Sequence, residues 1–290
     1  MSVRTNQDRL VMQCVMGEIQ HPTVKELPVR IDCEGRVHTL PNTGSIVYNV
    51  RLGDSVYGLA GDHIEPGVTI KNYRSGSENA ALNILSCIGN EAVVVSGDAK
   101  GAKGFVTGTH GGVEHVLLYF PREDLERMTI GDRIQIWALG QGLELTDYAG
   151  RVHVLNCSPA VLEKLELTPA GDRLRLPVAA VAPAHLMGSG YGEASSHHGD
   201  YDIMTEDWEE IVRHGLDRLR FGDIVLLENC DTRYGRGYLT GAQTVGVVVH
   251  SDCIRMGHGP GVTTLLTSRT PIFEPVLSQR ANLADIMGVG

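Results

Sequence analysis

Aromatic side chains account for only 5% of the 290 residues, and 35 acidic residues outnumber 25 lysines and arginines. The scarcity of aromatic rings argues against a surface that stacks nucleic-acid bases. A net charge of −10 excludes general binding to a phosphate backbone, which needs a surplus of cations. No stretch reaches the roughly 18 uninterrupted apolar residues of a membrane span. The composition therefore predicts a protein that binds neither nucleic acid nor membrane.

The six cysteines are scattered along the chain, and no two of them form a C-x-x-C pair. This spacing argues against a structural zinc knuckle and against a thioredoxin-type redox motif. The opening segment, MSVRTNQDRLVMQCV, lacks the apolar core of a secretory signal. We therefore expect a cytoplasmic protein whose thiols are free.

Glycine, by contrast, is abundant: 35 of 290 residues, or about 12% against ~7% in an average protein. Short runs of valine, isoleucine and leucine, separated by glycine, proline and aspartate, are typical of β-strands. Since 42% of the chain is hydrophobic, it can form a full core. Strands are predicted over residues 45–51, 92–96, 113–120, 133–139, 224–228, 244–250 and 262–267.

Helical patterns are fewer and shorter, and they fall on residues 79–87, 122–128, 159–165 and 205–220. The last is the strongest, with Thr205 as the expected N-cap and acidic residues in the first turn. We predict a β-rich α+β protein with barrel or sandwich-like sheets and a few short helices. The pattern changes near residue 157, which predicts an N-terminal β-rich domain over 1–157 and a C-terminal α+β domain over 158–290.

Two repeated patterns occur. The triplets Leu52-Gly53-Asp54, Ile130-Gly131-Asp132 and Phe221-Gly222-Asp223 each precede a strand-like segment. Glycine permits a tight turn there, and the aspartate accepts hydrogen bonds from turn amides. A fainter likeness between residues 110–113 and 258–262 leaves open that the chain has two related halves.

Ionisable residues gather in the segment 61–67, between two predicted strands. Asp62, His63 and Glu65 are ligand types for a divalent metal, or an acid and a base. The alternative is a polar surface turn with its corner at residues 66–67.

A glycine- and lysine-rich loop over residues 96–104 follows a buried-looking strand. The amides of Gly97, Gly101 and Gly104, together with Lys100 and Lys103, suit an anionic ligand. In the same loop, Asp98 and Lys100 are candidate catalytic groups. The loop is not a nucleotide-binding P-loop, because no Gly-Lys-Ser/Thr ends it. A solvated hairpin loop is the alternative.

Further candidates lie in the second half of the chain and at His110. The polar loop over 188–202 suits closure over a site, bringing in Asp200 or Asp202. His250 and His258 are candidate metal ligands, and Gly259 and Gly261 allow close approach of a ligand. A cysteine nucleophile is conceivable at two positions, but a buried structural thiol is favoured at both, Cys87 and Cys253.

Four strings carry a resemblance to a known family: AGDHIEPGV (60–68), SGDAKGAKGFVTGTHGG (96–112), YDIM (201–204) and VVVHSDCIRMGHGPGV (247–262). Together they resemble the prokaryotic family called domain of unknown function four-four-three-eight, over almost the whole chain. That resemblance implies a soluble, β-rich α+β protein and carries over no catalytic residues. Residues 97–104 also resemble the Gly-Asp-x-His-x-x-x-Gly run of acetamidase/formamidase-type amidohydrolases. Lys100 replaces the histidine of that run, which argues against a metal ligand there.

Two functions follow from these candidates. The preferred one is a metal-assisted hydrolase of a small amide or anionic substrate, with zinc, magnesium or manganese as the ion. Its candidate catalytic residues are Asp62, His63, Asp98, Lys100 and His110, and its candidate ligands are Asp62, His63, Glu65, His250 and His258. The alternative is a non-catalytic sensor of a small anionic metabolite, and a structural protein is the third option. A homo-oligomer is expected, as for most soluble enzymes.

Overall fold

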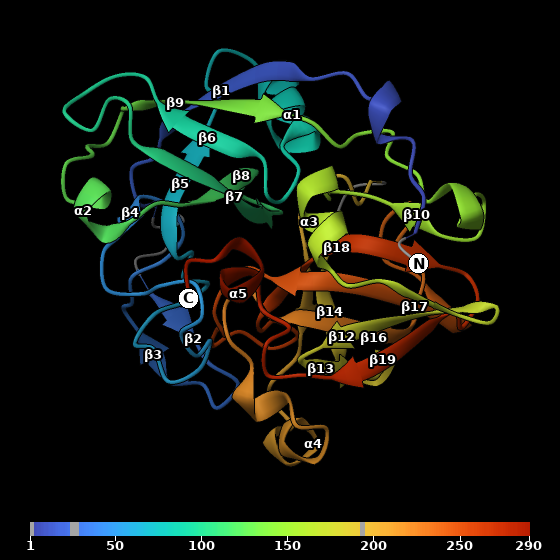
Figure 1. The fold of residues 1–290 in the computed structure, drawn as a ribbon. Helices are drawn as coiled ribbons and strands as arrows, with labels where there is room; N and C mark the ends of the chain where they lie inside the picture. The colour runs from blue at the N-terminus through green and yellow to red at the C-terminus, as the bar shows by residue number, and fades with distance from the viewer. Residues whose placement is uncertain (1–2, 24–28, 192–194) are drawn as a thin grey trace.

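The computed structural model describes residues 3–23, 29–191 and 195–290, and two large sheets dominate it (Figure 1). The first sheet lies in the upper part of the view and the second in the lower right. Five short helices accompany the sheets. The fold is therefore a β-rich α+β fold, as the sequence predicts.

The N-terminal sheet closes into a six-stranded barrel because its first strand pairs with both β9 and β5. The short strand β4 continues the sheet beyond β5. In spatial order the strands are β1 (Gln13–Ile19), β9 (Arg133–Ala138), β6 (Glu91–Val94), β7 (Lys103–His110), β8 (His115–Tyr119), β5 (Gly67–Lys71) and β4 (Ile46–Val47).

The C-terminal sheet is a half-barrel. Its path runs through β13 (Ala180–Ala182), β16 (Ile224–Cys230), β17 (Tyr238–Val248), β18 (Gly261–Ser268), β15 (Tyr201–Ile203) and β14 (Met187–Gly190), with β10 (His153–Val154) also on β18. A three-stranded sheet consists of β11 (Thr168–Ala170), β12 (Arg173–Val178) and β19 (Phe273–Leu277). The hairpin β2 (Arg30–Ile31) and β3 (Val37–His38) lies beside the lower half of the molecule (Figure 1).

The α-helices are α1 (Gly76–Leu85), α2 (Arg122–Leu125), α3 (Pro159–Lys164), α4 (Trp208–Arg213) and α5 (Leu283–Met287). Single 3₁₀ turns occur at Gln7–Arg9, Thr146–Tyr148, Ala184–Leu186 and Leu216–Arg218. Among the described residues, no helix has the length and apolarity needed to cross a bilayer.

The predicted long helix over 205–220 is wrong in its extent and its cap. The structure divides it into α4 and the turn Leu216–Arg218, because Gly215 takes a left-handed conformation between them. The N-cap is Asp207, whose carboxylate accepts a hydrogen bond from the amide of Glu210. Thr205 instead donates its hydroxyl to Asp252.

The repeated Gly-Asp triplets form the tight turns that their composition predicts. The glycines have φ of +94°, +91° and +87° at Gly53, Gly131 and Gly222. In each turn the aspartate accepts a hydrogen bond at 2.8–2.9 Å from the amide three residues earlier. Two of the turns also pair with each other, since the amide of Gly53 donates to the carbonyl of Phe221.

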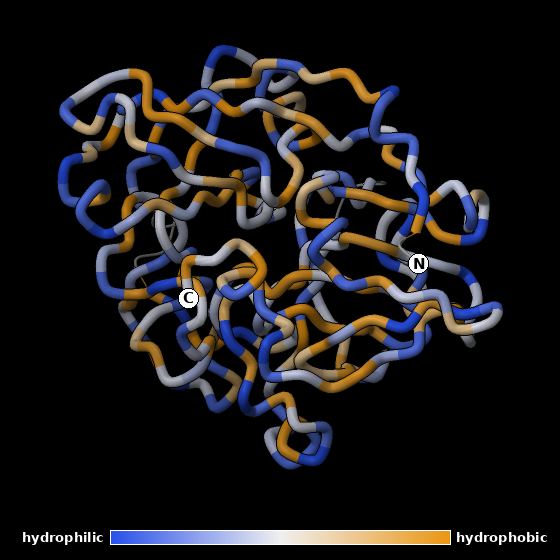
Figure 2. The backbone as a smooth tube through the Cα atoms, viewed as in Figure 1, coloured by the Kyte–Doolittle hydropathy of each residue, from blue (hydrophilic) through white to orange (hydrophobic). Residues whose placement is uncertain are grey.

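Hydrophobic residues follow the strands and hydrophilic residues the outer loops (Figure 2). One cluster fills the barrel, with Ile70 and Ile134 fully buried. The largest cluster joins the two sheets, because Leu117 of β8 and Leu265 of β18 belong to it. The two sheets thus share a core, which fixes the loops that lie between them.

Candidate functional site

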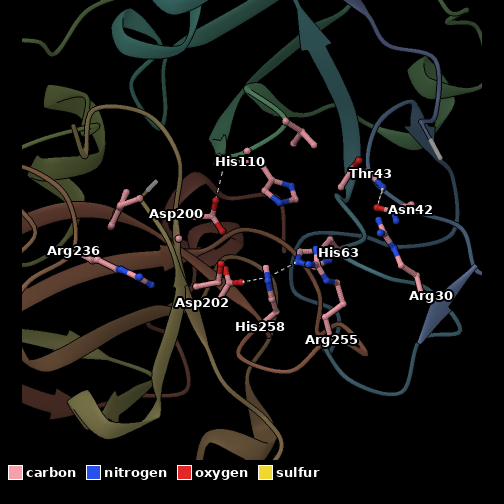
Figure 3. Close-up of a pocket in the computed structure, with 16 residues that line it drawn as sticks. Arg30, Asn42, Thr43, His63, His110, Asp200, Asp202, Arg236, Arg255 and His258 are labelled. Atoms are coloured by element: carbon pink, nitrogen blue, oxygen red, sulfur yellow. Dashed lines mark hydrogen bonds and ion pairs between the residues drawn. The ribbon is translucent and has the colours of Figure 1, made fainter. Parts of the chain in front are cut away.

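A cavity of about 410 Å³ receives side chains from both sheets (Figure 3). Its ionisable groups come from β2, the loop before β5, the end of β7, the start of β15 and the loops before and after β17. The lining consists of Arg30, Asn42, Thr43, His63, His110, Gly111, Gly112, Val113, Ser189, Gly190, Tyr191, Asp200, Asp202, Arg236, Arg255 and His258.

Asp62 and His63 lie in the loop before β5. Asp62 is fully buried and accepts hydrogen bonds from Arg30 Nε at 2.9 Å and Asn42 Nδ2 at 3.1 Å. Its other oxygen contacts His63 Nδ1 at 3.0 Å. Burial opposes ionisation of Asp62, but the contacts with His63 and Arg30 outweigh it and lower its pKa. Asp62 therefore orients the ring of His63, whose pKa burial lowers to about 4.

Glu65 is the buried acceptor of a second group of donors. Its carboxylate accepts from the amide of Gly44 and the hydroxyl of Thr69, both at 2.7 Å. It also contacts His110 Nδ1 at 2.5 Å and His115 Nδ1 at 3.1 Å. Burial alone would raise the pKa of Glu65, but the two histidines outweigh it and hold that pKa well below its ordinary value.

His110 and His115 reach the same carboxylate because of strand pairing. His110 ends β7, His115 begins β8, and the two are paired partners across the hairpin. Directly opposed residues of an antiparallel pair have their side chains on one face of the sheet. The hairpin therefore brings both rings to Glu65.

The C-terminal half contributes two aspartates and two histidines. His250 Nε2 contacts Asp200 Oδ2 at 2.7 Å and Asp202 Oδ1 at 3.5 Å. His258 Nδ1 contacts Asp202 Oδ2 at 3.0 Å and His63 Nε2 at 3.3 Å. Figure 3 shows the contacts of His258 with Asp202 and His63 near its centre.

The negative charge of the two buried aspartates is balanced by the neighbouring histidines. Burial alone would lower the pKa of His250, but Asp200 and Asp202 outweigh it and raise that pKa well above its ordinary value. Burial opposes ionisation of Asp202, yet contacts with His250 and His258 lower its pKa. The aspartates thus require positive charge at their side of the cavity.

Three imidazoles converge from both halves of the chain. The Nδ1 atoms of His63, His110 and His250 are engaged by Asp62, Glu65 and the carbonyl of Ser251. Their ligand atoms lie within 4.8 Å of one another, and the rings of His110 and His250 stack at 4.2 Å. We call His63, His110 and His250 the three-histidine cluster. Its residues are a donor set able to hold a metal ion.

Two further donor groups overlap this cluster: Asp200, Asp202 and His250, and His63, Cys253 and His258. A separate group on the surface consists of His185, Glu210 and His214. The overlapping groups add oxygen and sulfur donors around the same cavity.

The family follows from the sequence comparison. Residues 29–163 match the model described as domain of unknown function (DUF4438), N-terminal, and residues 164–287 match DUF4438, C-terminal. The chain belongs to the DUF4438 family. The two models meet six residues beyond the predicted division at 157/158, which stays a prediction.

A solved structure supports the architecture. The chain is similar to the protein in "Crystal structure of TM1086", with 47% sequence identity and a TM-score of 0.92 over 98% of each chain. A search of curated proteins finds no match. The comparisons thus identify the family and the fold, and they name no activity.

Six of the predicted site residues of this DUF4438 chain come together. They are Asp62, His63, Glu65, His110, His250 and His258. Asp200 and Asp202, predicted as part of a closing loop, join them. Part of that predicted loop, residues 192–194, lies outside the described residues.

The structure does not bring the lysine–glycine loop to the cavity. Asp98 and Lys100 are exposed, and the carbonyl of Asp98 accepts from Arg127. Lys103 forms an exposed ion pair with Glu91. The loop is the hairpin between β6 and β7, and its charged residues are exposed to solvent outside the cavity lining. The catalytic and substrate-binding roles predicted for this loop have no support in the geometry.

The same loop contains three glycines that were predicted to bind substrate, and the structure explains each of them by packing or by turn geometry. They are Gly97, Gly101 and Gly104. A Cβ at Gly97 would meet the carboxylate of Asp132 at 2.0 Å, and one at Gly104 would meet a backbone oxygen at 2.0 Å. Gly101 has φ of +93° in the turn. Chain packing and turn geometry account for all three residues.

Two further glycines that were predicted to bind substrate allow close packing near the site instead. They are Gly259 and Gly261. Neither lines the cavity. A Cβ at Gly259 would meet the carbonyl of Ile203 at 1.8 Å, so this glycine lets the segment before β18 approach β15. A Cβ at Gly261 would meet Asp200 Oδ2 at 2.0 Å and His250 Nε2 at 2.2 Å. Gly261 therefore leaves room for the Asp200–His250 contact.

Sequence reasoning missed His115 and three arginines that line the cavity, Arg30, Arg236 and Arg255. The signal for His115 was weak, because the sequence predicts only the second strand of this hairpin, over 113–120, and the pairing of residues 110 and 115 comes from the structure. The arginines carry no local motif, because only the tertiary fold brings them to the cavity.

The burial of the six cysteines can be tested by the reactivity of their thiols. Cys14 and Cys33 are exposed, whereas Cys87, Cys157, Cys230 and Cys253 are buried. Burial raises the pKa of Cys87 and of Cys230 to about 12, which suppresses the reactive thiolate. Titration of the native protein with a chromogenic disulfide at about pH 8 should give two fast thiols, and six in denaturant. A fast reaction at Cys253 or Cys87 would revive the cysteine-nucleophile hypothesis.

Proposed function

We propose that the cavity binds a divalent metal ion and uses it to hydrolyse a small amide or anionic substrate. The observation that supports this is the convergence of the three-histidine cluster, with its ligand atoms within 4.8 Å of one another. Each ring is held through Nδ1 by a carboxylate or a backbone carbonyl. The Nε2 of His250 also contacts Asp200 at 2.7 Å, and a bound metal would replace that contact. Ligating histidines in metalloproteins are oriented in this way.

The donor set favours zinc among the three predicted ions. Zinc accepts imidazole nitrogen, and catalytic zinc sites combine three protein ligands with one open position. Magnesium prefers oxygen ligands and keeps much of its water. Asp200 and Asp202, both buried beside His250, make manganese the second candidate because carboxylates suit it.

A divalent ion at the cluster would lower the pKa of a bound water molecule towards neutrality. His258 is the base in this proposal. Its Nδ1 contacts Asp202 at 3.0 Å, which leaves Nε2 as the atom that accepts a proton. Asp202 orients the ring, as carboxylates do for catalytic histidines. His258, predicted as a ligand, therefore takes a different part in the proposed site.

Metal analysis of the purified protein tests the proposal. Wild-type protein stripped with chelator and reloaded with zinc should bind one ion in the cavity. The variants His110→Ala and His63→Ala should each weaken that binding at least about 100-fold, since each removes one of three nitrogen donors. Asp98→Ala is the matched control and should bind zinc as the wild type does, because Asp98 is exposed and outside the cavity lining.

Titration calorimetry measures these affinities, and circular dichroism checks the fold of each variant. The variant His185→Ala disrupts the surface donor group. The difference in bound zinc between this variant and the wild type gives the zinc that binds at the surface. Equal zinc affinity in His110→Ala, His63→Ala and Asp98→Ala would exclude the metal from the cavity.

A further inference from the structure

We infer that the cavity recognises an oxyanion, a carboxylate or a phosphate, through Arg236 and Arg255. The inference deepens the proposed function by naming its substrate class. It rests on that proposal only in treating the bound anion as a substrate. The anion site itself depends on the arginines.

Arg255 is the first observation. It lines the cavity beside His258, on the segment between His250 and β18. Its guanidinium forms no hydrogen bond or ion pair with any residue of the described ranges. Arginine carries five N–H donors in a planar fork that matches a carboxylate or a phosphate. All five are therefore available to a ligand.

Arg236 approaches from the other side. Figure 3 shows Arg236 and Arg255 on opposite sides of His258, with the guanidinium of Arg236 pointing inward. Arg236 donates Nη1 to the carbonyl of Gly188 at 2.7 Å, which fixes the side chain without neutralising its charge. Its remaining donors form no other bond within the part of the chain that the structure describes.

The acidic groups of the cavity do not neutralise these arginines. Asp202 contacts His250 and His258, and Asp200 contacts His250 and the amide of Gly111. Asp62 is neutralised by Arg30 at 2.9 Å. In a chain with net charge −10, the cavity thus contains two arginines that have no acidic partner among the residues that the structure describes. Both side chains are exposed at the cavity, so water competes there for their donors, and a guanidinium binds a carboxylate or a phosphate through paired, charge-assisted hydrogen bonds.

The three-histidine cluster and the two arginines line the same cavity or contact its lining. An oxyanion on the arginines would leave the rest of a small molecule within the same 410 Å³ as His63 and His110. Pockets of this size hold small molecules. The substrate class is therefore a small carboxylate- or phosphate-bearing compound.

Titration calorimetry with two probes tests the inference. Inorganic phosphate is added to the metal-free protein, and succinate to metal-free and zinc-loaded protein. The variants are Arg255→Met and Arg236→Met, singly and together. Arg173→Met is the control, since Arg173 is exposed on β12 and lies outside the cavity lining.

Wild type and Arg173→Met should bind at least one probe, and each cavity variant should bind it about tenfold more weakly or worse. The probe that binds more tightly identifies carboxylate or phosphate as the preferred group. Equal binding by the wild type and the double variant, or no binding of either probe by the wild type, overturns the inference. Arginine-dependent binding by a protein that takes up neither zinc nor manganese would retain the anion site and remove the hydrolase, which leaves the sensor function.

Discussion

Replacing Glu65 by alanine is expected to lower the free energy of unfolding by about 3–5 kcal/mol. Glu65 is 1% exposed and accepts from Gly44, Thr69, His110 and His115. The substitution leaves buried donors without an acceptor, and each unsatisfied donor costs about 1–3 kcal/mol before relaxation. Urea unfolding of the metal-free protein measures the loss, so that altered metal binding does not contribute.

The matched control is Glu91→Ala. Glu91 forms an exposed ion pair with Lys103, and such pairs contribute about 0–1 kcal/mol. Its unfolding midpoint should stay close to that of the wild type. Unfolding curves of the Glu65 and Glu91 variants that coincide would show that Glu65 does not hold the two histidines in solution.

Gly261→Ala is expected to weaken metal binding about 10–100-fold while the protein still folds. The added methyl would stand 2.0 Å from Asp200 Oδ2 and 2.2 Å from His250 Nε2, so both side chains must move. These atoms are the ends of side chains and not backbone, which lets the fold absorb the change. The substitution therefore acts on the site more than on the strand.

Zinc titration and thermal unfolding of the same sample separate the two effects. Gly76→Ala is the control, because a Cβ at Gly76 meets no atom within 4 Å. It should leave zinc affinity unchanged. A Gly261 variant that binds zinc as tightly as wild type would mean that His250 is not a ligand.

The fold was largely predictable because its signals are local. Apolar runs and Gly-Asp turns depend on neighbours within a few residues, and Asp54, Asp132 and Asp223 all accept the turn amide three positions earlier. The cap of α4 was missed because Thr205 and Asp207 are both good caps. The contact of Thr205 with Asp252, 47 residues away, decides between them.

The candidate site was predictable only in part. Residue type identified His63 and Glu65, but it equally favoured Lys100, whose loop proves to be an exposed hairpin. Which polar loops meet depends on pairings such as Asp202 with Gly261, and a sequence alone does not contain that register. Arg236 and Arg255 reach the cavity for the same non-local reason.

The contact between His63 and His258 spans 195 residues and has a consequence for synthesis. A ribosome makes the chain from its N-terminus, so the barrel with His63 and His110 emerges well before His250 and His258. Until the last strands are synthesised, only the N-terminal part of the chain can bury the carboxylates of Asp62 and Glu65. If the cavity binds a metal as proposed, its capture by the three-histidine cluster must await synthesis of His250, and a nascent chain arrested near residue 200 would lack that ligand.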